Sequence, residues 1–299
     1  MSNPMNKNAN IQFPTFNHVF RNITISKKGH YQLFTSIFDI RCLFFFLLFC
    51  LSGCTSAPYT NRSQLMLTSE KTEMQMGEET FKEIKDKGKI SKDDKKNSAV
   101  KRVGKNIAKA TGKQDYNWEF IVLESKDVNA FCLPGGKVVV YTGLFSYIHN
   151  DGDLATVLGH EIGHALARHA GEQLSHTYIE SAGGYILSAV LSIVGAPPGV
   201  GSIYGVATRF GIDLPYSRTQ EYEADHIGII VMAKAGYDPK TAIIFWKEFS
   251  KEQNYGPVKE FFATHPMGEK RLEELKKLLP EAEKIYAAVP LKFGTGEKL

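Results

Sequence analysis

The sequence His-Glu-x-x-His at residues 160–164 restricts the structure and chemistry of this chain more than any other feature. On a helix, His160 and His164 lie one turn apart on one face, where both imidazoles can reach one tetrahedral ion such as zinc. Glu161 lies beside that face and can accept a proton from a metal-bound water. Apolar flanking residues indicate a buried helix, in which imidazole and charged groups need partners. The motif therefore predicts a metal-dependent hydrolytic site; the alternative is a chance match on a surface helix.

The helix that carries this motif is expected to begin with Asp151 or Asp153 as its cap and to continue to about Ile179. A metzincin-type third histidine would come six residues after the second motif histidine, where this chain has Ala170 instead. His169 therefore lies off the ligand face. We expect it either to support a ligand from behind or to face solvent.

A second helix, expected from about residue 217 to residue 235, supplies candidates for the third ligand. Glu221 lies at the N-terminal end of a helix face made of small residues. This face can pack against the face around His164, which is also made of small residues. Glu223 heads a bulkier side. We therefore expect Glu221 to complete the site for one zinc ion per chain, and Asp225 to hold the other ring nitrogen of a ligand histidine. The alternative is a pair of acidic residues on the surface.

Composition narrows the function without identifying it. The chain has 299 residues, of which 43% are hydrophobic, and this is enough for a packed core. Its net charge of +4 is small and dispersed, so nucleic-acid binding is not expected. Its four cysteines contain no Cys-x-x-Cys pair, so a thiolate zinc cluster is not expected either.

The region before the motif contains a candidate export signal. Arg41 is followed by an apolar run and then by Leu-Ser-Gly-Cys at residues 51–54, which resembles a bacterial lipobox with Cys54 as the lipidated residue. The alternative is an uncleaved signal anchor. The expected organisation is a leader with a lipoprotein signal peptide (1–53), a tether (54–67), a metallopeptidase domain (68–290) and a tail (291–299).

Periodicity and turn residues predict the other elements of the domain. Residues 137–142 include Val138, Val139 and Val140 and are expected to form an edge strand that holds an extended substrate beside the metal helix. The alternative is an ordinary hairpin that covers the core. Further helices are expected at 69–87, 98–110, about 240–253 and 269–279, the last broken by Pro280, with a strand at 118–123 and a turn-rich joint at 129–136.

The segment from Ser181 to Thr208 contains no charged side chain. Its apolar part is split by Pro197-Pro198-Gly199 and is shorter than the roughly twenty residues needed to span a membrane. We expect a buried or lid-like helix followed by a Gly-rich loop over the cleft, and contact with a membrane surface is the lesser alternative.

Several ordered motifs resemble those of metallopeptidase family forty-eight, the group of HtpX-, BepA- and Oma-type zinc endopeptidases. The likeness extends from about residue 65 to residue 288, nearly the whole predicted mature chain. The motifs are Asn129-Ala130-Phe131, Leu133-Pro134-Gly135-Gly136, His160-Glu161-x-x-His164, Glu221-x-x-Ala224-Asp225, and Thr264-His265-Pro266 with Arg271.

This resemblance implies an α+β, predominantly helical, zincin-like fold with a small antiparallel sheet. It implies that His160, His164 and Glu221 bind zinc and that Glu161 is the general base. It places His265 near the metal, where this residue stabilises the oxyanion or gates the site. It gives supporting roles to Asp225 beside the ligands and to Arg271, which braces the segment around His265.

The expected function is a zinc endopeptidase that cuts misfolded or misassembled envelope proteins. A lipid anchor would hold it at the periplasmic side of a membrane, with the outer membrane favoured because Thr55, and not an aspartate, follows Cys54. The alternative is a chaperone-like lipoprotein that binds unfolded chains and has a latent zinc site. A purely structural zinc protein is disfavoured, since it would need neither Glu161 nor Asp225. The sequence leaves the oligomeric state open.

Overall fold

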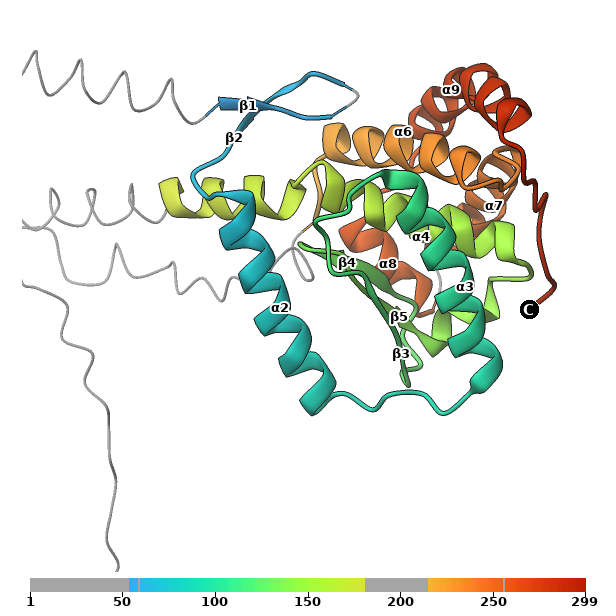
Figure 1. The fold of residues 1–299 in the computed structure, drawn as a ribbon, viewed down its shortest axis with the longest axis horizontal. Helices are drawn as coiled ribbons and strands as arrows, with labels where there is room; N and C mark the ends of the chain where they lie inside the picture. The colour runs from blue at the N-terminus through green and yellow to red at the C-terminus, as the bar shows by residue number, and fades with distance from the viewer. Residues whose placement is uncertain (1–53, 59, 181–214, 255) are drawn as a thin grey trace, which may run out of the picture. The chain divides into compact units, whose positions relative to one another are not determined.

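The structure is a computed structural model that describes residues 54–58, 60–180, 215–254 and 256–299. The predicted leader and the predicted lid segment lie outside the described residues. No helix in these ranges is long and apolar enough to cross a membrane. The helices are α2 (Glu70–Lys87), α3 (Asp94–Thr111), α4 (Asp151–Leu166), α6 (Arg218–Lys234), α7 (Lys240–Phe249), α8 (Val258–Thr264) and α9 (Glu269–Ala288), with short 3-10 turns at η1 (Thr142–Ser146) and η2 (Ser250–Glu252) (Figure 1).

Two small sheets accompany the helices. Strands β1 (Cys54–Ser56) and β2 (Ser63–Leu65) form an antiparallel hairpin. Strands β3 (Glu119–Leu123), β4 (Ala130–Leu133) and β5 (Lys137–Tyr141) form the second sheet in the order β3-β5-β4. The predicted antiparallel pairing applies to β4 and β5, whereas β3 and β5 are parallel. The mostly helical α+β fold is thus confirmed, with a mixed sheet.

The predicted role of Val138, Val139 and Val140 as a substrate-binding edge strand is wrong. These residues lie in β5, which is the middle strand and has its backbone groups paired on both sides. They are fully buried, as expected for a central strand. Because the predicted joint at 129–136 contains a strand of its own, β4 forms one edge of the sheet and β3 forms the other.

Helix α4 is the central element, since all its residues are buried and it contacts α3, α6, α7 and β4. Its crossing with α6 is close enough to exclude side chains. A Cβ atom on Gly163 would lie 2.6 Å from the carbonyl oxygen of Ala224, and one on Gly228 would lie 2.9 Å from the carbonyl carbon of Gly159. The small sides of both helices therefore meet, and this crossing brings the start of α6 to the two motif histidines.

Helix α4 is shorter than predicted. Asn150 caps it, because its Oδ1 accepts a hydrogen bond from the backbone of Asp153 (3.0 Å). The helix ends at Leu166, and a second helical stretch occupies residues 169–180. Between them, Arg168 has a left-handed backbone (φ 57°) and its guanidinium pairs with buried Glu73 (2.7 Å). This ion pair compensates for a backbone conformation that non-glycine residues rarely adopt.

Other boundaries also differ from the sequence-based expectation. Helix α3 begins at Asp94, before the predicted Ser98, because Asp93 caps it by accepting from two backbone N–H groups. Helix α9 continues through Pro280 to Ala288. A proline inside a helix costs about 3 kcal/mol, but Leu275 and Ala282 are buried on either side of it. Packing of these two residues on the core therefore outweighs the lost hydrogen bond.

The predicted tail lies against the start of α4. The backbone N–H groups of Asp151 and Gly152 donate to the carbonyl oxygens of Glu297 (2.9 Å) and Thr295 (2.8 Å). Asp151 also pairs with Arg102 of α3 (2.7 Å). Because the first N–H groups of a helix have no partner within the helix, these contacts satisfy donors that α4 cannot satisfy itself.

Candidate metal centre

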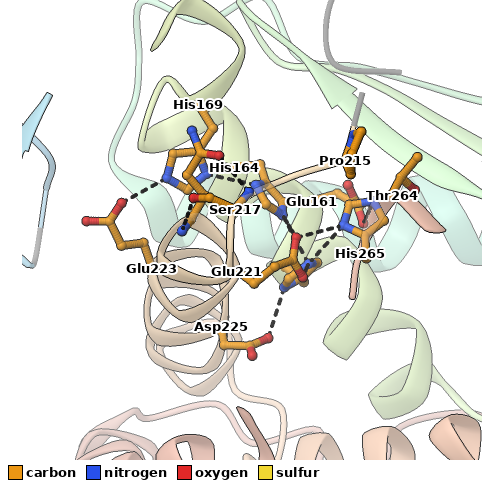
Figure 2. Close-up of polar contacts among 12 residues, drawn as sticks. Glu161, His164, His169, Pro215, Ser217, Glu221, Glu223, Asp225, Thr264 and His265 are labelled. Atoms are coloured by element: carbon orange, nitrogen blue, oxygen red, sulfur yellow. Dashed lines mark hydrogen bonds and ion pairs between the residues drawn. The ribbon is translucent and has the colours of Figure 1, made fainter. Parts of the chain in front are cut away.

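Four buried side chains meet where α4 crosses α6. His160 and His164 come from α4, Glu221 from the first turn of α6, and His265 from the residue that follows α8. One ligand atom from each lies within 4.8 Å of the others. Figure 2 shows His164, Glu221 and His265 pointing toward one another. The Nε2 atoms of the two α4 histidines are 3.1 Å apart.

Local structure fixes the two donors of this cluster that α4 does not supply. A capping box holds the start of α6, with Ser217 Oγ accepting from the backbone of Gln220 and Gln220 Oε1 accepting from the backbone of Ser217. This places Glu221 in the first turn. His265 caps the C-terminus of α8. Its backbone N–H donates to the carbonyl oxygen of Phe261 (2.9 Å), and its ring stacks on the Phe261 ring with centroids 4.8 Å apart.

The donor set fits zinc. When both Nδ1 atoms of the α4 histidines carry protons, the lone pairs of the two Nε2 atoms face each other at 3.1 Å, and a metal ion or a shared proton must lie between them. A carboxylate and a third imidazole complete a set of nitrogen and oxygen donors that zinc prefers. Glu221 is ionised: burial raises its pKa, but the charges of Arg271 and His265 outweigh burial and hold the pKa well below its usual range.

A carboxylate supports His160 from behind. Asp225 Oδ1 accepts from His160 Nδ1 (3.0 Å), and Arg271 of α9 donates to both oxygens of Asp225 (2.5 and 2.9 Å). Arg271 also pairs with Glu221. Burial and the charge of Arg271 lower the pKa of His160, but its hydrogen bonds to Asp225 and Glu221 outweigh both and raise it to about 9. A metal must therefore displace a proton from this ring.

Glu161 lies beside the donors and is not one of them. It is buried, and among the described residues its Oε1 has no hydrogen-bond partner. Its Oε1 lies 3.7 Å from Nε2 of His265. Burial raises the pKa of Glu161. A buried carboxylate oxygen without a donor can accept a proton from a water molecule in the adjoining cleft.

This cleft passes between β4 and the segment after α8. Residues 129–134, which include β4, line one wall, and the rest is lined by Glu161, Ala170, Tyr216, Thr264 and His265. Within the described part of the chain β4 pairs only with β5, so its other edge is unpaired, and its residues line the cleft.

Sequence reasoning missed two contributions to the site. Tyr216 stacks on the His164 ring with centroids 3.8 Å apart, and no motif marks this residue. Arg62 lies in the predicted tether, yet it pairs with buried Glu223 (2.8 Å). Of the two alternatives for His169, a supporting position behind a ligand agrees with the structure, because this residue is fully buried against His164. Glu223, set aside as a ligand, is outside the four-donor cluster.

Glu223 is ionised where it meets His169. Burial raises its pKa, but hydrogen bonds from His169 and Arg62 outweigh burial and lower the pKa to about 2. Its side chain points away from the four donors and toward His169 (Figure 2). The two carboxylates of this turn of α6 therefore have different partners, because they project from different sides of the helix.

A buried His-Glu-x-x-His helix joined by a glutamate from a second helix, in a mostly helical α+β fold, defines a zincin-like metallopeptidase domain. The chain belongs to peptidase family M48, whose family model matches residues 94–279. This confirms the family resemblance inferred from the motifs. The metal of this family is zinc, in agreement with the donor set.

Relatives of this chain include proteins named as metalloendopeptidases and one named as a protease. Mitochondrial metalloendopeptidase OMA1 of Schizosaccharomyces pombe is 33% identical over 230 residues, which cover 76% of this chain and 66% of that protein. Metalloendopeptidase OMA1, mitochondrial, of Bos taurus is 31% identical over 273 residues, covering 87% of this chain and 52% of that protein. The beta-barrel assembly-enhancing protease of Escherichia coli is 27% identical over 212 residues, covering 68% and 43%. The chain spans between 43% and 66% of the length of these three relatives.

Proposed function

We propose that this protein is a zinc-dependent endopeptidase that hydrolyses peptide bonds of misfolded or misassembled membrane and envelope proteins. One observation carries the proposal. Glu161 places a buried carboxylate oxygen without a hydrogen-bond partner among the described residues beside the four-donor cluster and at the wall of the cleft. A purely structural metal site has no use for such a group.

Different residues of the site have different roles in the proposed reaction. His160, His164 and Glu221 would hold the zinc ion, which when bound would supply a Lewis acid and lower the pKa of the attacking water. Glu161 Oε1 accepts a proton from the attacking water and returns it to the leaving amine. His265 lies on the cleft side of Glu161, where its imidazole can donate to the carbonyl oxygen of the substrate or close the cleft.

The free edge of β4 supports an unfolded protein as the substrate. An extended peptide can add to this edge through backbone hydrogen bonds, which do not depend on the peptide's sequence. Folded proteins rarely expose a segment in this form, whereas misfolded and unassembled chains do. The edge strand for substrate is thus Ala130–Leu133 in place of the valines of β5.

Removal of the metal tests the proposed activity. Purified protein is expected to cleave reduced, unfolded casein, to lose this cleavage after treatment with a zinc chelator, and to regain it when one equivalent of zinc is added. Gel electrophoresis of the products measures the cleavage, and metal analysis measures the zinc. Cleavage that persists in zinc-free protein would contradict the proposal.

A chaperone-like binding protein with a latent site is the second candidate. The observation that favours it is the fourth donor: if His265 joins the three proposed ligands, four protein groups surround the ion and leave no position for water. Casein left intact by protein that carries one zinc per chain would favour this candidate.

We further propose that Cys54 carries a lipid that holds the protein at the periplasmic side of a membrane. The Leu-Ser-Gly-Cys sequence at 51–54 and the apolar run before it support this assignment. In a bacterial host, Cys54→Ser is expected to abolish incorporation of an alkyne-labelled fatty acid. Cys132→Ser is the matched control and should keep the label. Labelling of the Cys54→Ser protein would refute the assignment.

A further inference from the structure

The second ligand histidine has an unusual partner. His164 turns Nε2 toward the other donors, and its Nδ1 lies 2.8 Å from Nδ1 of His169. His169 is fully buried and comes directly after the left-handed residue Arg168. The break between α4 and the helical stretch 169–180 therefore turns this imidazole back toward the metal site.

The contacts continue from His169 to a carboxylate and an arginine. His169 Nε2 lies 3.0 Å from Oε2 of Glu223, whose side chain is 2% exposed. Arg62, between β1 and β2, donates to this oxygen from Nε (2.9 Å) and Nη2 (2.8 Å). The same guanidinium donates to both oxygens of Glu172 (2.7 Å each), and Thr60 donates to Glu223 Oε1.

One arrangement of protons satisfies every contact in this series. His164 binds a metal through the lone pair of Nε2, so its proton must be on Nδ1, and it donates to Nδ1 of His169. That nitrogen then accepts, which places the proton of His169 on Nε2. From there it donates to the carboxylate of Glu223.

We propose that His169, Glu223 and Arg62 are positioning residues that fix the tautomer and ring orientation of His164 for zinc binding. The inference rests on the proposed zinc site. Each of the two proposed ligand histidines is then supported by a carboxylate that pairs with an arginine. For His160 these are Asp225 and Arg271. For His164 they are Glu223 and Arg62, which act through His169. The hairpin that follows Cys54 thereby contributes to a metal site more than a hundred positions away in the sequence.

Zinc affinity is the measurement that tests this inference. His169→Phe keeps a buried ring and removes both hydrogen bonds, and loss of such a partner typically weakens metal binding about 10- to 100-fold. His176→Phe is the matched control, since His176 is an exposed residue of the same helical stretch. Competition with a chromophoric chelator should show weaker zinc binding and faster zinc release for His169→Phe than for His176→Phe.

A conservative variant distinguishes positioning from packing. His169→Gln supplies an amide that can both accept and donate, so it is expected to recover part of the lost affinity although it fills the space less well than Phe. The absorption spectrum of the cobalt-loaded protein should shift in His169→Phe and lie closer to that of the unaltered protein in His169→Gln. A Gln variant that binds zinc no better than the Phe variant would assign His169 to packing alone.

Arg62→Gln provides the test if His169→Phe does not fold. Arg62 is partly exposed and does not contact any of the four donors, and its replacement should accelerate zinc release without emptying the site. Equal zinc affinities for His169→Phe and His176→Phe, or for Arg62→Gln and the unaltered protein, would overturn the inference. Failure of the unaltered protein to bind zinc would instead overturn the proposed zinc site.

Discussion

Glu161→Gln is expected to lower kcat/KM for cleavage of unfolded casein by about 10²- to 10⁴-fold, the usual contribution of a positioned general base. The amide has nearly the same shape as the carboxylate but cannot accept the proton of the attacking water. Glu161 is not one of the four clustered donors, so the zinc content should remain at one per chain. Initial rates of cleavage and metal analysis of the same samples provide both measurements.

The control for this variant is Glu79→Gln, which makes the same chemical change at an exposed position of α2. Its activity should equal that of the unaltered protein. Full activity in Glu161→Gln would rule out the proposed base. Loss of zinc together with activity would instead show that Glu161 helps to hold the metal.

Arg271→Met is expected to lower the free energy of unfolding of the zinc-free protein by about 3–5 kcal/mol, the typical effect of removing one partner from a buried ion pair. Arg271 is 2% exposed, and its guanidinium pairs with Asp225 and Glu221. Methionine fills similar space but leaves two carboxylates without their cation. Urea unfolding in the presence of a chelator measures the change.

Lys270→Met is the matched control for this experiment because Lys270 is the exposed neighbour of Arg271 on α9. Its free energy of unfolding should change by no more than about 0.5 kcal/mol. A similarly small change in Arg271→Met would show that the two carboxylates do not depend on the arginine.

The parts of the site that lie on one face of a helix could be predicted from the sequence. Helical periodicity brings His160 and His164 together, and the small residues on both helices favour Glu221 over Glu223 for the position nearest the histidines. The structure has this arrangement because Gly163 and Gly228 allow the two backbones to meet. Such signals are local, so a single sequence contains them.

Features that depend on distant pairing could not be predicted in the same way. The run of valines in β5 is typical of a buried strand, but its place in the middle of the sheet depends on where β3 and β4 pair. The end of α4 depends on an ion pair between Arg168 and Glu73, which are far apart in the sequence. Arg62 pairs with Glu223 across a still larger separation in the sequence, and the residues around Arg62 do not mark it.

The close contact between α4 and α6 also bears on whether the protein folds before or after it binds its metal. Backbone atoms of Gly159 and Gly228 meet in this contact, and fully buried aliphatic residues such as Leu158 and Ile227 belong to the same core. None of these atoms needs an ion, so folding of the two helices can assemble the ligand side chains in advance. The ion can then enter a chain that has already folded. If the protein is exported unfolded, as the proposed lipid anchor implies, it can cross the membrane first and bind its metal on the far side.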